Sequence, residues 1–316
     1  MLRLWQCHTF PAPHPTLRTT AGGILVHHEQ PDAGPALPKL AGRLLALFRY
    51  WNIIQYYYPY KYAIGAEWTT VLRTFIPRFQ HATTPLAYHL LVLELAAQLH
   101  DTHAFVYGSS VLSAHFGNYY PPLELTLLEG QAVIAQVYSD VSPTPLPVRV
   151  GDVVLQANGE AVPQLLARYQ PYVAASTPAA ATRDLLRFVL RGQAQDSLAL
   201  TVRTALGVVK TIRLARPLSI LSLRSATYKS YFYGMNLQDT MRIWRPLSGN
   251  LGYLHLGGLQ PQDIPHVLHL FQHTKGLVID LRTYPQGNLN PLFMALQPAP
   301  PPVRHLGFAP VNAALP

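Results

Sequence analysis

The sequence predicts an α+β protein of several domains: an N-terminal helical segment, a compact and mostly β module, and the first part of an α/β domain. Three observations lead to this fold class. Apolar residues recur at helical spacing over residues 39–99, short strand-like runs begin at residue 123, and a strand–helix–strand pattern begins near residue 249. The chain has 316 residues, 49% of them hydrophobic, which is enough for more than one core.

The first 100 residues contain a proline-rich start followed by three predicted helices. Residues 1–38 hold six prolines and little periodicity, so we expect a disordered leader. Apolar spacing then predicts helices over residues 39–58, 68–76 and 85–99. We assign these helices to an N-terminal helical domain that covers residues 39–118.

Local signals mark the ends of the three helices. Pro59 closes the first, and Pro77 is expected to stop the second, because proline lacks the N–H that a continuing helix needs. Thr84 is a suitable N-cap for the third helix, with Pro85 at its first position.

Residues 119–214 predict the β module. Two strands flank Glu129-Gly130, a third ends in an Asn158-Gly159 turn, and a further hairpin turns about Leu206-Gly207. Five short strands within this length make a compact module of ordinary domain size. The two helices expected in the module cover residues 163–169 and 182–191.

The last part of the chain predicts a βαβ unit. After a connector over residues 215–246, "GNLGYLHLGGL" is a strand, "PQDIPHVLHLFQHT" a helix and "KGLVIDLRTYPQG" a second strand that runs into a loop. A parallel sheet of two strands cannot cover its own faces. We therefore expect residues 247–316 to form only part of an α/β domain.

Composition excludes several function classes. The formal charge of +9 comes from 24 scattered Lys and Arg against 15 Asp and Glu, without the basic block that nucleic-acid binding needs. The longest apolar stretch, Leu86 to Leu99, is shorter than the about 20 residues of a membrane span, so no integral membrane segment is expected.

Cys7 is the only cysteine, which excludes an internal disulfide and a Cys-based zinc cluster. The start of the chain has no apolar run of signal-peptide length, and the oligomeric state stays open.

The segment "LHDTHAFVYG" ends the third predicted helix in His100, Asp101, Thr102 and His103. Three interpretations are open: imidazoles placed favourably near a helix C-terminus, a metal site, or the base of a hydrolase. A zinc hydrolase that uses His100 and His103 remains an outside alternative, but we expect no metal and no cofactor. Three further histidines belong to the helix before "KGLVID", whose buried face is expected to be Val267, Leu268, Leu270 and Phe271. The histidines expected on its solvated side are His266, His269 and His273.

The stretch "VRVGDVVLQANGEAV" resembles the fingerprint of PDZ domains. The residues that carry the resemblance are Gly151, Asp152, Asn158 and Gly159. PDZ domains bind peptides by adding a strand to a sheet edge and by holding a terminal carboxylate on backbone amides. The alternative is an ordinary β-hairpin, since Asn-Gly turns are common.

Three features in this order resemble the tail-specific, or C-terminal processing, serine peptidases. They are a helical segment ending in "DTHA", a PDZ-like module, and a βαβ unit that contains "GLVIDLRTYPQG". The resemblance is strongest to the branch similar to the tricorn protease core, and it covers about Lys39 to Leu296. It implies that the last domain is the first part of a ClpP/crotonase-like protease core.

The resemblance also implies roles for individual residues. His103 is the expected general base, Asp101 or Thr102 would orient its ring, and the loop that holds Gly287 would donate an N–H to the oxyanion. Gln286 stands where relatives often have another glycine. No serine follows Ser248, so we expect the nucleophile half to be missing and the truncated chain to be inactive.

Two functions of different class follow from these features. The first is a serine-type endopeptidase that uses the PDZ-like module to hold substrate C-termini. The second is a non-catalytic protein that binds peptides through this module alone. The expected partner is a polypeptide substrate or a peptide C-terminus in both cases. The compartment stays open, although relatives are usually exported.

Overall fold

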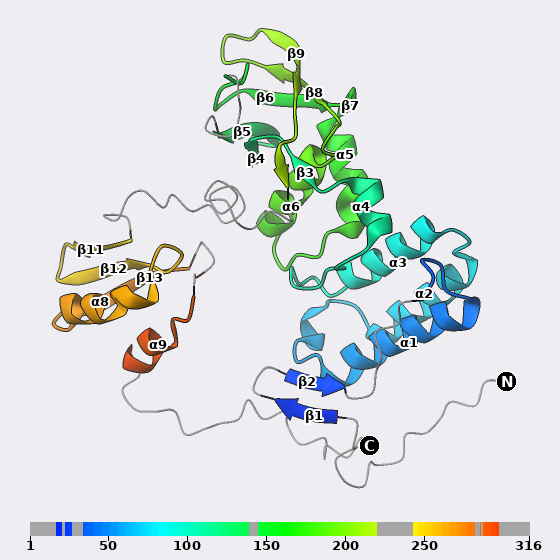
Figure 1. Ribbon diagram of the computed structural model, residues 1–316, viewed down its shortest axis with the longest axis horizontal. Coiled ribbons are helices and arrows are strands. Elements are labelled where there is room, and N and C mark those ends of the chain that lie inside the picture. Colours follow the sequence, from blue (N-terminus) through cyan, green and yellow to red (C-terminus); the bar gives the residue numbers. More distant parts are fainter. Residues whose placement is uncertain are drawn as a thin grey trace.

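The computed structural model describes residues 34–138, 145–219, 243–281, 285 and 287–296, together with the backbone of two short strands near the N-terminus (Figure 1). Helices and mostly antiparallel strands are both present, which confirms the mixed α+β class. Within the described residues, no helix is long and apolar enough to cross a membrane.

The N-terminal strands were not predicted. β1 (Leu17–Thr20) pairs antiparallel with β2 (Gly23–Val26). Leu17 lies opposite Val26, and Thr20 lies opposite Gly23. The other residues of the leader up to residue 33 lie outside the described residues, so the predicted disorder is not tested there.

The three predicted helices are present as α1 (Leu40–Tyr57), α2 (Trp68–His81) and α3 (Pro85–Ala97). The predicted cap of α3 is confirmed, because the Thr84 hydroxyl accepts a hydrogen bond of 3.1 Å from the N–H of Ala87. A 3-10 turn, η1 (Lys61–Ala63), lies between α1 and α2.

The predicted end of α2 at Pro77 is wrong, because the helix continues to His81. A proline inside a helix costs about 3 kcal/mol, and packing offsets this cost. Phe79 is 1% exposed in the core of the helical segment, on the same face as Phe75 four residues earlier. Arg78 makes two hydrogen bonds of 2.6 Å to the carboxylate of Glu94 on α3. Both contacts require the turn after Pro77 to stay helical.

The β module is an antiparallel sheet with the strand order β4-β5-β6-β8-β9, and β7 pairs with β6. The predicted turns are confirmed: Glu129, Gly130, Asn158 and Gly159 have φ values of 50°, 75°, 50° and 82°, as two-residue hairpin turns need. The strands are Leu123–Leu128 (β4), Gln131–Val137 (β5), Val153–Ala157 (β6), Glu160–Ala161 (β7), Leu198–Arg203 (β8) and Val209–Leu214 (β9).

Two helices pack against the sheet of the β module. α5 (Val162–Tyr169) and α6 (Pro178–Leu190) contribute buried side chains to the same hydrophobic cluster as the strands, and a 3-10 turn, η3 (Gln170–Tyr172), follows α5. A two-stranded ladder of β3 (Tyr119–Tyr120) and β10 (Leu218–Ser219) joins the two ends of the module.

One helix, α4 (Ser110–Phe116), was not predicted. It lies between the helical segment and the β module. Leu112 and Phe116 form a small cluster with Leu93 of α3, and Tyr169 and Phe188 of the β module pack against this cluster. These contacts make an apolar junction between the two parts. Figure 1 shows α4 between α3 and the β module.

The predicted βαβ unit is confirmed. β12 (Leu251–His255) and β13 (Gly276–Asp280) run parallel, and a 3-10 turn, η5 (Pro261–Asp263), and α8 (Ile264–Phe271) connect them. A third strand, β11 (Trp244–Leu247), pairs antiparallel with β12 and lies at the end of the segment that was expected to be a connector with room for a short strand.

A last helix, α9 (Asn290–Leu296), contributes the buried Leu292 to the hydrophobic cluster of this part. The predicted buried face of α8 is only partly correct. Val267 and Phe271 are buried, whereas Leu270 is 43% exposed. The third member of the buried face is Ile264, three residues before Val267.

Candidate functional site

The carboxylate and imidazole of the "HDTH" segment are in contact. The chain leaves α3 through His100, which has a left-handed φ of 52°. Oδ1 of Asp101 accepts a hydrogen bond of 2.9 Å from the N–H of His103 and lies 3.1 Å from Nδ1 of the same residue. A further bond of 2.8 Å from the N–H of Ala104 to the carbonyl of Asp101 closes the turn. One carboxylate therefore fixes both the backbone and the ring of His103.

The second oxygen of Asp101 contacts the end of α1. The hydroxyl of Tyr58 donates to Oδ2 of Asp101 over 3.4 Å. The hydrogen bond from the backbone N–H of His103 is the main cause of the lowered pKa of Asp101, whereas burial acts to raise this pKa. Burial and the neighbouring Asp101 carboxylate raise the pKa of Tyr58. Sequence reasoning missed Tyr58, because nothing local connects it to a residue 43 positions later.

The ring of His103 is open to solvent on its other side. The side chain is 86% exposed, and the described residues give Nε2 no hydrogen-bond partner. When Nδ1–H donates to a carboxylate, Nε2 is the proton acceptor of the neutral ring. Thr102 is exposed and makes no described hydrogen bond, so Asp101 is the neighbour that contacts the ring.

A stability measurement tests the Asp101 contacts. The lowered pKa of Asp101 stabilises the folded chain above the carboxyl's unfolded pKa of about 3.9, and this contribution is lost as the pH falls through the folded value. Asp101→Asn removes the charge. We expect the difference in unfolding free energy between the parent chain and this variant to be largest near about pH 7 and to shrink as the pH falls below about 3.9 in urea titrations. Thr102→Ala is the matched control, and a pH-independent difference for Asp101→Asn would contradict the contacts.

His100 lies on a different surface. It lines a pocket of about 400 Å³ together with Gln98 of the helical segment and Pro171 and Leu185 of the β module. No described hydrogen bond joins it to Asp101 or His103. Among the described residues, no three side chains of His, Cys, Asp or Glu lie close enough to hold a metal ion.

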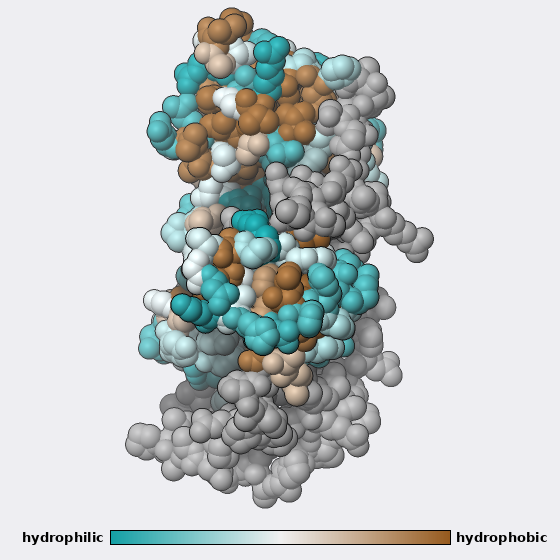
Figure 2. All heavy atoms as spheres, turned by 90° about the vertical axis from the view of Figure 1, so that its left-hand side faces the viewer, coloured by the Kyte–Doolittle hydropathy of each residue, from teal (hydrophilic) through white to brown (hydrophobic). Residues whose placement is uncertain are grey.

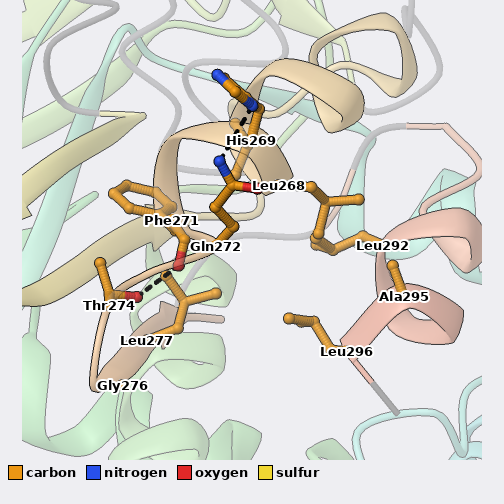
Figure 3. A pocket seen from close by; sticks show the side chains of 11 residues that line it. Leu268, His269, Phe271, Gln272, Thr274, Gly276, Leu277, Leu292, Ala295 and Leu296 are labelled. Carbon is orange, nitrogen blue, oxygen red and sulfur yellow. Dashed lines mark hydrogen bonds between the residues drawn. The ribbon is translucent and has the colours of Figure 1, made fainter. Parts of the chain in front are cut away.

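His266 and His269 of α8 and His273 just after it are exposed, as predicted, and within the described part of the chain they belong to no group that could hold a metal ion. Nδ1 of His269 lies 3.2 Å from the side-chain amide of Gln272. Both residues are at the edge of an otherwise mostly apolar pocket of about 650 Å³ between α8 and α9. Figure 3 shows the imidazole of His269 turned away from Leu292 and Leu296 of α9.

The residues of the PDZ-like fingerprint hold the β module together. Asp152 is 4% exposed, and its carboxylate accepts a hydrogen bond of 2.9 Å from the N–H of Arg149. Asn158 exchanges two hydrogen bonds with the backbone of Ala199, one of them through its side-chain oxygen at 3.0 Å. Gly151 has a φ of 95°, which favours glycine at this turn. These contacts build the turns and ladders of the sheet.

The end of β13 carries a buried carboxylate that sequence reasoning did not single out. Asp280 is 8% exposed, and its Oδ2 accepts a hydrogen bond of 2.6 Å from the hydroxyl of Tyr253 on β12. Its carbonyl accepts from the N–H of Leu256 at 3.0 Å. The only sequence signal was an acidic residue at the end of an apolar strand.

Gly287 lies in the loop after β13 and has a left-handed φ of 76°. A Cβ there would lie 3.0 Å from Cγ of Pro261, at the start of η5. Gln286 lies outside the described residues. The described contacts of Gly287 are with this part of the chain, and none joins it to His103, so the structure does not bring the two predicted site residues together.

Comparisons with known proteins agree with this architecture. A scan against protein-family models finds no match, and a search of curated proteins finds none. Among solved structures, a mutant of CPAF matches with a TM-score of 0.55 at 14% identity and covers 79% of this chain. Mature CPAF complexed with lactacystin matches with a TM-score of 0.50 at 15% identity over 76% of this chain. The chain spans 57% and 55% of the length of these two CPAF chains.

A third solved structure is a photosystem II D1 C-terminal processing protease, at 16% identity over 76% of this chain and 60% of its own length. Its TM-score is 0.33. At these identities the likeness to CPAF shows the fold alone. CPAF is a member of the tail-specific protease family, so the resemblance expected from the sequence is confirmed at the level of the fold.

Proposed function

We propose that the chain contributes the general base and the peptide-holding module of a serine-type endopeptidase of the tail-specific family. The observation that carries this proposal is the contact of 3.1 Å between Nδ1 of His103 and the carboxylate of Asp101, with Nε2 open to solvent. In serine peptidases a carboxylate holds the imidazole in the tautomer whose other nitrogen takes the serine proton. Nε2 of His103 would take that proton and later return it to the leaving amine.

The oxyanion donor and the nucleophile complete the proposed reaction. The N–H of Gly287 is the proposed oxyanion donor, because its left-handed loop follows β13 as the family resemblance implies. Oxyanion donors of this kind accelerate such reactions by about 10²- to 10³-fold. The described contacts of His103 are with Asp101, so the nucleophilic serine is expected to lie outside the described residues.

A cleavage assay tests the proposal. The native protein, isolated from its own cells, is incubated with unfolded casein, with and without a fluorophosphonate or a metal chelator. We expect cleavage that the fluorophosphonate abolishes and the chelator does not affect. Loss of cleavage with the chelator alone would instead support the zinc hydrolase, and absence of both cleavage and reaction with the fluorophosphonate would contradict the peptidase proposal.

The second candidate function is non-catalytic peptide binding. It is favoured by the continuous sheet and the hydrophobic core that the described residues of the β module form. The described residues also place no serine against His103. This function predicts peptide binding by a native protein that neither cleaves casein nor reacts with a fluorophosphonate. The same assay therefore separates the two functions.

A further inference from the structure

The end strand β4 offers one side of the β module for strand addition. β4 is the first strand in the order β4-β5-β6-β8-β9, so one of its edges has no partner strand among the described residues. The carboxyl end of β4 carries two apolar side chains that are exposed to solvent, Leu127 at 39% and Leu128 at 59%. Figure 2 shows that hydrophobic residues lie at the surface of the β module as a whole, in the upper part of the view. An extended peptide can pair with such an edge through backbone hydrogen bonds.

A peptide paired with β4 must place each of its ends near one end of this strand. The amino end of β4 follows Pro121 and Pro122, both of which are buried. Proline has no backbone N–H. The N–H of Leu123 is already used in a hydrogen bond of 2.8 Å to the carbonyl of Pro121. Three successive residues therefore offer no free amide to a carboxylate.

The residues before these prolines are paired as well. Tyr119 exchanges hydrogen bonds of 2.9 and 3.0 Å with Gly192. In a strand, successive residues direct their backbone N–H and C=O groups to opposite sides. Tyr120 therefore directs these groups away from Gly192, toward β10, where it lies opposite Leu218. The nest of free N–H groups that a terminal carboxylate needs is therefore missing from residues 119–123.

The cations near this end of β4 are engaged elsewhere. Arg191 donates through Nε to the carbonyl of Gly117 and through Nη2 to the side chain of Asn118 at 2.9 Å. Nη1 of Arg187 lies 3.6 Å from the carboxylate of Asp184. At the other end of β4, the turn contains Glu129, whose exposed carboxylate would repel a second one. Neither end of the strand is suited to hold a free C-terminus.

We infer that the β module binds an internal, extended and apolar polypeptide segment along the free edge of β4, without using a terminal carboxylate. This inference rests on the peptide-holding role proposed above and changes the ligand from a peptide C-terminus to the interior of a chain. The apolar side chains of the segment would cover Leu127 and Leu128, and its backbone would pair with β4.

The test compares the same peptides with and without a C-terminal charge. A library of ten-residue apolar peptides, labelled with fluorescein, is prepared as free acids and as amides, and binding to the full chain is measured by fluorescence anisotropy. We expect acid and amide forms to bind with dissociation constants within about twofold of each other, since the carboxylate adds no contact. N-methylation of alternate peptide residues is expected to abolish binding, because pairing needs the peptide N–H groups.

A variant pair locates the site on the sheet. Leu127→Lys places a charge on the binding edge and is expected to weaken binding by about tenfold. Val209→Lys is the control, because Val209 is 56% exposed on β9 at the opposite end of the sheet. It should leave binding unchanged.

Each other outcome would overturn the inference. Binding of the acid forms at least about tenfold tighter than the amides would show carboxylate capture, with the peptide-holding role intact. Equal weakening by both variants would place the site elsewhere, and absence of binding in either format would remove the role itself. The casein assay decides the peptidase proposal independently of these results.

Discussion

Gly117→Ala is expected to destabilise the folded chain by at least about 3 kcal/mol. Gly117 ends α4 with a φ of 76°, a conformation that alanine adopts only with strain. An added Cβ would lie 1.9 Å from the carbonyl carbon and oxygen of Gly192. Gly192 cannot move away, because its own Cα lies against the guanidinium of the buried Arg216, where a Cβ would meet Cζ at 2.5 Å.

The control for this variant is Gly207→Ala. Gly207 has a similar φ of 79°, but a Cβ there would have nothing within 4 Å. It should cost only the backbone strain of about 1–2 kcal/mol. Urea unfolding followed by circular dichroism measures both variants. Similar losses of stability in the two would contradict the close packing of α4 against the β module.

Phe79→Ala is expected to cost about 3–5 kcal/mol, as is typical when a buried phenylalanine is truncated. Phe79 is 1% exposed and makes an edge-to-face contact with Tyr88 of α3, with ring centroids 5.8 Å apart. Phe48→Ala is the matched control, because Phe48 of α1 is 38% exposed. Its substitution should change the free energy of unfolding by less than about 1 kcal/mol. A small effect of Phe79→Ala would show that α2 does not extend past Pro77 into the core.

Elements defined by local chemistry were predictable from the sequence. The cap of α3 depends on Thr84 and the N–H of Ala87, three residues later. The turns at Glu129-Gly130 and Asn158-Gly159 depend on residues that tolerate positive φ. In each case the interacting groups are neighbours in the chain, so the pattern alone is informative.

Elements defined by distant contacts were not predictable. α2 continues past Pro77 because Phe79 packs into the core and Arg78 reaches Glu94, 16 residues away. β11 forms because Trp244 finds a partner in Leu254 of β12. Such contacts outweigh local propensity, and the sequence pattern does not contain them.

The candidate site shows the same division. Asp101 and His103 are two residues apart, so their proximity could be predicted from the sequence. The structure places their side chains in contact. Tyr58 and Tyr253 reach their carboxylates across 43 and 27 residues, and neither was found. The ladder role of Asn158 also required the sheet, because its partner Ala199 is set by the register 41 residues away. The partner of Asp152 is local, since its carboxylate bonds the N–H of Arg149 three residues earlier.

The central claim is that His103 is the general base for a serine nucleophile. The most direct measurement is fluorophosphonate labelling of the native protein, isolated from its own cells, followed by mass spectrometry of the modified residue. We predict stoichiometric labelling of one serine that falls at least about 100-fold in rate with His103→Ala and is unchanged with His100→Ala. No labelling of the native protein, or labelling that His103→Ala does not slow, would contradict the claim.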